Sequence, residues 1–188
     1  MNAVALVISA FALIVSIATA WLTLFRRGQL RMTRPVFVGF VWDTPGGEPK
    51  IFLRAMLYAT GKRGYTVEAL YLKIRCQKIE HLFSFWTLRQ DGRMTIGSGI
   101  SVGEEGVSAD FHFLPPREAH NFRFLAGHYA IAVYARIADR DSPALLSSLQ
   151  LDLSEEQARA MGPNMMNSVF FNWQPEQDSY HSYIEGPR

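Results

Sequence analysis

The residue types in this chain that most often carry chemistry are its one cysteine and five histidines. Asp110 and His112 lie two apart in a predicted strand, and together with His120 they could form a metal site, since carboxylate and imidazole are common metal ligands. No paired His or Cys spacing supports such a site, and exposed strand faces carry these residues routinely. Cys76 falls on the apolar face of a predicted strand, where a lone thiol is usually a small buried hydrophobe. We therefore predict no bound metal and no nucleophilic cysteine.

Sequence motifs give no indication of catalysis. The chain contains no P-loop, no dinucleotide-binding fingerprint and no serine-nucleophile elbow. The segment 103–106 has a glycine at each end, but its two central carboxylates would repel a phosphate. Glu155 and Glu156 open a predicted helix, where the helix dipole already accounts for them. We predict that the protein is not an enzyme and has no cofactor.

Charge is distributed unevenly along the 188 residues. Residues 3–25 carry no charge, and as a helix they would span roughly 34 Å against a hydrocarbon core of about 30 Å. Trp21 lies where an interfacial aromatic side chain is expected. We predict a transmembrane helix over 1–25. A cleaved signal peptide is the alternative, because small residues at 18 and 20 resemble a cleavage site, yet no Lys or Arg precedes the run and residues 21–25 continue it.

Basic residues directly after the apolar run define a linker over 26–34. By the positive-inside rule, they place the N-terminus outside and the C-terminal domain in the cytoplasm, and we expect the bacterial inner membrane. Without these four, the 19 basic residues become 15 against 17 acidic ones, so the remaining domain is slightly acidic and nucleic acid is not expected as a partner. The four topology-setting residues are Arg26, Arg27, Arg31 and Arg34.

Small and polar residues recur along the predicted helix at alternating spacings of three and four. Such a seam suits close helix packing, because small side chains let two backbones approach and hydroxyls can bond across the contact. We predict packing against a second copy or another membrane protein. Alternatively, the hydroxyls bond back to their own helix, or the seam lines a narrow pore. The seam residues are Asn2, Ala5, Ser9, Ala12, Ser16, Thr19 and Thr23.

From residue 35 onward the apolar residues alternate with polar ones at a period of two, which is typical of half-buried strands in antiparallel sheets. Four segments show the pattern best: 51–59, 66–76, 128–137 and 145–153. Further strand candidates are 36–42, 81–88, 94–100, 108–114, 121–125 and 169–173. The segments 36–42 and 82–86 are apolar on both faces, which indicates an extra covering element or a protein interface.

One helix is predicted within this region. It begins at a capping box formed by Ser154 and Gln157 and ends at about Met161, before a Gly-Pro pair. The polar tail at 175–188 is expected to be loosely ordered.

The segment 124–129, with Tyr129 ahead of alternating apolar residues, resembles the turn and tyrosine-bearing strand of immunoglobulin-like sandwiches. In those domains the tyrosine hydroxyl bonds to backbone at a corner of the sandwich. The resemblance implies that 145–153 is the last strand, paired with the tyrosine strand. A single cysteine leaves no intradomain disulfide. We predict an all-β fold, with one immunoglobulin-like antiparallel β-sandwich over 35–174.

Together these features favour a non-catalytic, single-pass, membrane-anchored interaction module. We expect it to form a homo-oligomer through its helix and to bind a protein partner. One alternative is a ligand-sensing membrane effector, whose β domain controls helix rearrangement or a pore. A second alternative is an envelope or secretion-apparatus component with an external β domain.

Overall fold

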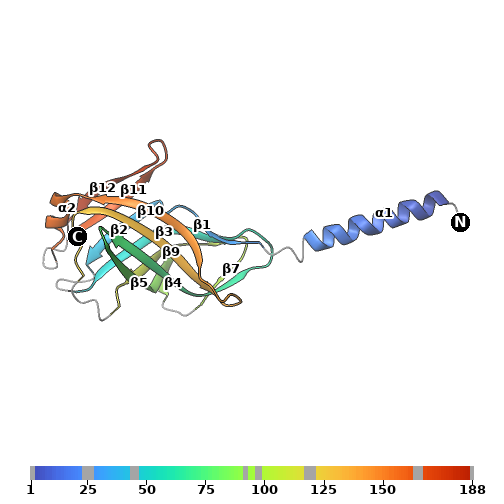
Figure 1. The fold of residues 1–188 in the computed structure, drawn as a ribbon, viewed down its shortest axis with the longest axis horizontal. Coiled ribbons are helices and arrows are strands. Elements are labelled where there is room, and N and C mark those ends of the chain that lie inside the picture. The colour runs from blue at the N-terminus through green and yellow to red at the C-terminus, as the bar shows by residue number, and fades with distance from the viewer. Residues whose placement is uncertain are drawn as a thin grey trace.

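The computed structural model describes residues 3–22, 28–42, 47–90, 93–95, 99–116, 122–162 and 167–186. An N-terminal helix, α1 (Ala3–Ala20), projects from one end of an elongated β domain, and a short helix, α2 (Glu155–Ala160), lies at the other end (Figure 1). The strands are β1 (Leu30–Met32), β2 (Phe37–Trp42), β3 (Pro49–Ala59), β4 (Tyr65–Cys76), β5 (Ile79–Gln90), β6 (Arg93–Thr95), β7 (Ile100–Val102), β8 (Val107–Leu114), β9 (Gly127–Ile137), β10 (Ala144–Leu153), β11 (Ser168–Gln174) and β12 (Ser179–Glu185).

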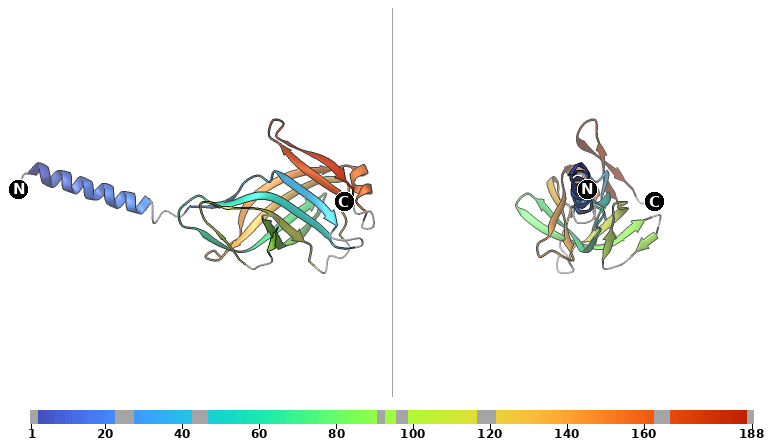
Figure 2. Two further views of the ribbon diagram at one scale, coloured as in Figure 1. Left: turned by 180° about the vertical axis from the view of Figure 1, so that it is seen from behind. Right: turned by 90° about the vertical axis from the view of Figure 1, so that its right-hand side faces the viewer.

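The strands that the structure describes belong to one antiparallel sheet. Its order is β10-β9-β4-β5-β8-β3-β2-β11-β12, with β1 added to β3, β6 to β5 and β7 to β4. The sheet curls into a nearly closed barrel (Figure 2), because long twisted strands such as β3 and β4 pair on both edges. The predicted all-β class is confirmed. The immunoglobulin-like sandwich is not confirmed, since the pairing joins the strands into one sheet rather than two stacked ones.

The barrel interior is filled by alternate residues of the long strands, as the period of two predicts. The inward positions of β3, β4 and β9 are buried, among them Leu53, Leu72 and Val133. The alternation over 145–153 predicts that Leu145 points inward on the same face as Leu149, and this is wrong for Leu145, which is 57% exposed, whereas Leu149 is buried. A register shift between Leu145 and Ser147 in the β10–β9 pairing changes the face on which Leu145 lies.

The outer face of β2 is covered by aromatic side chains of the same domain. Phe37 stacks on Phe170 of β11 with ring centroids 5.2 Å apart, and it lies 5.6 Å from Phe52 of β3. Gly39 is buried and lies between Phe52 and Phe170 in the strand register. A Cβ at Gly39 would lie 2.2 Å from the Phe52 ring. The covering expected over this two-sided strand is therefore supplied by neighbouring strands.

The linker is fixed to the barrel from Gly28 onward. The Thr60 amide donates to the Gln29 carbonyl at 2.9 Å, and the Gln29 amide donates to the Thr60 hydroxyl at 2.7 Å. The Tyr65 hydroxyl donates to the Gly28 carbonyl. β1 then pairs with the end of β3. We call this end of the barrel the helix-proximal end, and the end near α2 the distal end.

Two expectations about irregular segments are wrong. Residues 179–185, within the predicted loose tail, form β12, which pairs with β11 over its whole length. Residues 122–125, predicted as part of a strand, are irregular, although Phe122 and Phe124 are buried. The segment 179–185 is rich in hydroxyl and aromatic residues and lacks an apolar run, so its sequence did not indicate a strand. The segment 122–125 was predicted as a strand because the apolar side chains of this buried loop resemble those of a strand.

Candidate binding groove

The sheet order ends at β10 on one side and at β12 on the other. Among the residues that the structure describes, neither strand has a strand paired to its outer edge. At the helix-proximal end, β1 contacts β10 and brings the barrel close to closure. The hairpin of β11 and β12 meets the barrel beside α2, and its turn points away from the barrel (Figure 2). A groove therefore opens between the hairpin and β10.

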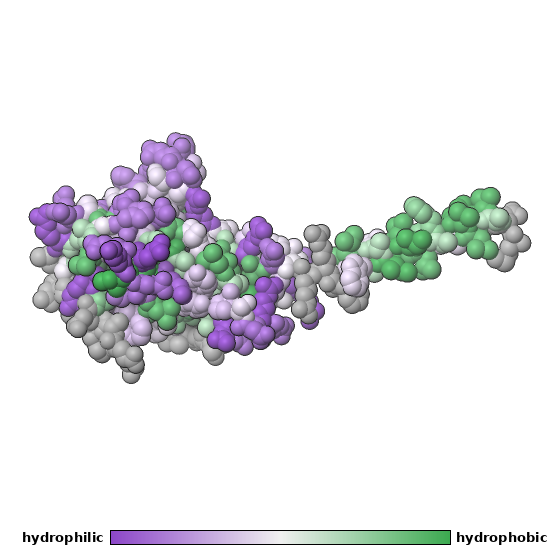
Figure 3. All heavy atoms as spheres, viewed as in Figure 1, coloured by the Kyte–Doolittle hydropathy of each residue, from purple (hydrophilic) through white to green (hydrophobic). Residues whose placement is uncertain are grey.

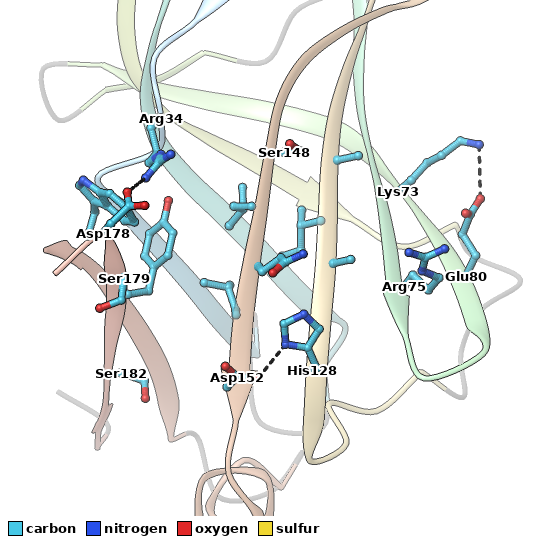
Figure 4. A pocket seen from close by; sticks show the side chains of 18 of the residues that line it. Arg34, Lys73, Arg75, Glu80, His128, Ser148, Asp152, Asp178, Ser179 and Ser182 are labelled. Carbon is cyan, nitrogen blue, oxygen red and sulfur yellow. Dashed lines mark hydrogen bonds and ion pairs between the residues drawn. The ribbon is translucent and has the colours of Figure 1, made fainter. Parts of the chain in front are cut away.

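The groove has a volume of about 710 Å³ and is open to solvent. One wall is the outer surface of β10, β9 and β4, and the other is the hairpin, with Arg34 beside it (Figure 4). Ala130 and Ala132 lie on the outer side of β9 and make this wall shallow. Leu149 and Leu151, whose side chains point toward the core, also line the groove. The groove thus combines a polar rim with an apolar base.

The hairpin wall is held in place by Trp173, Tyr180 and Arg34. The two aromatic rings lie 5.0 Å apart, and the Arg34 guanidinium lies 4.0 Å from the Trp173 ring centroid. Arg34 also forms an ion pair with Asp178 at 2.7 Å. The Tyr180 hydroxyl donates to the Pro35 carbonyl at 2.6 Å, and burial raises the pKa of Tyr180 to about 12. These contacts tie the hairpin to the segment between β1 and β2.

The barrel wall carries balanced charge. Lys73 pairs with Glu80 at 3.3 Å, and His128 Nδ1 lies 2.8 Å from Asp152. Arg75 faces Glu80 in the strand register, but no ion pair within 4.0 Å joins it to any described residue. Most groove cations therefore have a carboxylate nearby, which argues against a phosphate-rich or nucleic-acid ligand.

The pair of His128 and Asp152 resembles a catalytic dyad only in its residue types. Their side chains are 54% and 86% exposed, so water screens the pair and no low-dielectric site surrounds it. We interpret this pair as a surface contact between neighbouring strands, because His128 and Asp152 lie directly opposite each other in the β10–β9 register.

Helix α2 bounds the distal end of the groove. Ser154 and Gln157 form the predicted capping box, which is therefore confirmed. The Gln157 side chain also donates to the Ser182 hydroxyl of β12 at 2.8 Å. Beyond the helix, the Met161 carbonyl accepts a hydrogen bond from the Trp42 indole at 3.2 Å. The connection that follows β10 is thereby attached to both β2 and β12.

The proposed helix seam lies on an exposed helix. The hydroxyls of Ser9, Ser16 and Thr19 each donate to a carbonyl one turn earlier at 2.8 Å, as the second interpretation of the seam expects. Each hydroxyl oxygen can still accept a bond from another helix. The seam residues Ala5 and Ala12 provide two of these carbonyls. Asn2 and Thr23 lie outside the described residues.

The predicted topology residues separate in the structure. Arg26 and Arg27 lie outside the described residues. Arg31 is in β1, where its guanidinium donates to the Gln29 side chain at 3.1 Å. Arg34 is part of the groove, a role that a linker position did not suggest.

The histidine and cysteine candidates do not converge. Asp110 binds the Arg54 guanidinium through two hydrogen bonds of 2.7 and 3.1 Å, and this bonding raises the pKa of Arg54. His112 is buried and stacks on Phe52 at 5.3 Å. His120 lies outside the described residues. Within the described ranges, no three His, Cys, Asp or Glu side chains are placed to hold a metal ion.

The tyrosine of the immunoglobulin-like segment does bond at a corner. The Tyr129 hydroxyl donates to the Leu125 carbonyl at 2.7 Å, and burial raises the pKa of Tyr129 well above its ordinary value. Half-buried Cys76 lies beside it in the β4–β9 register. The pairing of β10 with β9, which the resemblance also implies, is present.

Comparison of the chain with protein-family models, curated proteins and solved structures finds no match. The groove was not expected from the sequence. Its clearest signals are the alternate small residues Ala130 and Ala132 on the polar face of a strand, and the aromatic pair of Trp173 and Tyr180 on either side of a turn.

Proposed function

We propose that this protein is a non-catalytic, single-pass, membrane-anchored β domain that binds a protein partner in the groove between β10 and β12. The observation that carries the proposal is the groove itself: an open, charge-balanced surface with an apolar base between two sheet edges. Such a surface suits a polypeptide better than a phosphate or a small charged metabolite.

Helix α1 supports the anchoring. It is long and apolar enough to cross a membrane, and none of its side chains is buried against the β domain. Figure 3 shows the helix as hydrophobic over most of its length, while the visible face of the β domain is mixed and largely hydrophilic. An unburied helix of this composition is unstable in water unless a bilayer or another apolar partner covers it.

Photocrosslinking in cells tests partner binding. A photoreactive residue at Gln150, which is exposed on the groove wall, should give a protein adduct. The same residue at Ser108, which is exposed on β8 away from the groove, serves as the control. Replacing Ala132 with Arg should abolish the Gln150 adduct by filling the groove, whereas Ser108→Arg should not. Equal adducts at both positions, or none at either, would contradict the proposal.

The orientation of the anchor is tested separately. The arginines that follow the helix support a cytoplasmic β domain. Alkaline phosphatase fused to the C-terminus should then be inactive, and green fluorescent protein at the same place should fluoresce. The reverse result would favour the external envelope component.

A ligand-sensing membrane effector is a second candidate, and the fixed linker favours it. Because Gln29 exchanges hydrogen bonds with Thr60 at the barrel end, a rearrangement of the barrel would reach the helix through a short connection. A dye-leakage assay on reconstituted vesicles separates the two functions. Leakage that depends on a small molecule would support the effector.

A further inference from the structure

We infer that the partner binds as an additional antiparallel strand, inserted between β10 and β12. This inference rests on the proposed function, and it specifies the form of the partner as an extended segment. Peptide strands that add to a sheet edge gain affinity from main-chain hydrogen bonds and specificity from alternate side chains.

The number of strands supports the inference. The main path of the sheet has nine strands among the described residues, and every neighbouring pair on it is antiparallel. With an odd number of alternating strands, the first and the last run in the same direction. β10 and β12 therefore both run from the helix-proximal end toward the distal end, and they cannot close the barrel as an antiparallel pair. A tenth strand running the other way would be antiparallel to both.

The dimensions of the edges set the length of the segment. β10 has 10 residues and β12 has 7, so a segment of about seven residues, roughly 23 Å long, could pair with both edges. Its N-terminal end would lie near α2, and its C-terminal end would point toward the membrane helix.

The groove lining sets the pattern of the segment. Leu149, Leu151 and the ring of Tyr180 lie at the base, so the inward side chains of the inserted strand should be apolar. Ser148 and Gln150 are uncharged and lie on the outer side of β10, so the outward side chains should be polar and uncharged. The occupant to which these contacts point is a strand of alternating apolar and hydroxyl residues.

An appended strand tests insertion directly. β12 runs toward the distal end, so a C-terminal extension that turns back would enter the groove in the required direction. Asn-Gly followed by seven residues alternating Thr and Val, added after the last residue of the full chain, provides the turn and the strand. The matched control carries Pro in place of each Val, because Pro cannot donate to a ladder.

Hydrogen exchange and thermal unfolding report the result. The Thr/Val extension should slow amide exchange in β10, in β12 and in the extension itself by at least tenfold relative to the Pro control, and it should raise the unfolding midpoint. Free exchange of the extension, with the midpoint of the Pro control, would overturn insertion. Sheet edges can also be shielded from pairing by their own polar side chains, without any added strand. Edges of that kind would leave the extension exchanging freely.

The crosslinking assay then separates the inference from the function on which it rests. The Thr/Val chain should lose the partner adduct at Gln150, while the Pro chain keeps it. An inserted extension that leaves the adduct intact would overturn strand addition and leave groove binding standing. Absence of the adduct from the unextended chain would contradict the proposed function and, with it, this inference.

Discussion

Two tyrosine hydroxyls each donate a hydrogen bond to a backbone carbonyl in an irregular segment just before a strand. Tyr129 bonds to Leu125 before β9, and Tyr180 bonds to Pro35 before β2. Both phenols are buried enough that their pKa values rise, because desolvation disfavours the charged phenolate. Each hydroxyl therefore acts as a neutral donor to a backbone carbonyl.

Replacing Tyr129 with Phe should lower the free energy of unfolding by about 1 kcal/mol, since one hydrogen bond is lost while the buried ring remains. Urea unfolding of the detergent-solubilised chain measures the change. Tyr71→Phe is the control, because Tyr71 stacks on Tyr134 at 5.2 Å and its hydroxyl makes no hydrogen bond to any residue that the structure describes. An equal loss in both variants would mean that the corner bond has no special weight.

The pKa of Tyr180 predicts a stability change at high pH. Its folded-state pKa is about 12, against an ordinary value of 10.0, so the folded chain holds this proton more tightly than the unfolded chain. The resulting stabilisation is complete below about pH 10 and is lost as the pH rises toward 12. The free energy of unfolding should therefore fall more steeply with pH in the wild type than in Tyr180→Phe. Parallel pH profiles would refute the role of this phenol.

At the scale of elements, the junction between α1 and the barrel depends on glycine. A Cβ at Gly28 would lie 2.4 Å from the Gly61 backbone nitrogen. The close approach lets the linker exchange hydrogen bonds with the turn between β3 and β4. Any side chain there would push the two backbones apart.

Gly28→Ala should therefore release the linker from the barrel end. We expect the Thr60 amide, which donates to Gln29, to exchange with solvent at least tenfold faster, as hydrogen exchange with mass spectrometry or NMR would measure. Gly103→Ala is the matched control, because a Cβ at Gly103 has no heavy atom within 4 Å. Unchanged protection of Thr60 in the Gly28 variant would contradict a fixed linker.

At the scale of the whole molecule, the sequence predicts the strands better than their arrangement. Alternation identifies inward faces, since burial depends on which side of a strand a residue lies. It carries no information on whether distant strands form one sheet or two, nor on the register shift that exposes Leu145. The groove lies between β10 and β12, the two ends of the sheet order, so the small and aromatic residues that line it cannot be recognised as one site before the strand order is known. β12 was missed because Tyr180 and Tyr183 pack on other aromatic rings without a hydrophobic run.

The helix seam predicts association in the membrane. Replacing Ser9, Ala12 and Ser16 with Leu should disperse a detergent-stable oligomer, because bulky side chains prevent close approach of the backbones. Val7, Leu13 and Val15 lie off the seam, and their replacement by Ala provides a control that should keep the oligomer. Light scattering with detergent correction measures the mass. An unchanged mass in the Leu variant would refute the seam.

The fixed linker limits where binding can take place. Leu22 and Gly28 are joined by six residue steps, which reach at most about 22 Å, and β10 adds roughly 33 Å along the groove. In the proposed anchored state, the groove stays within about 55 Å of the bilayer, and so does any segment it holds. A partner anchored in the same membrane would meet it at an effective concentration in the millimolar range. Weak intrinsic affinity would then be sufficient, and a free peptide in dilute solution would bind far less than the same segment on a membrane protein.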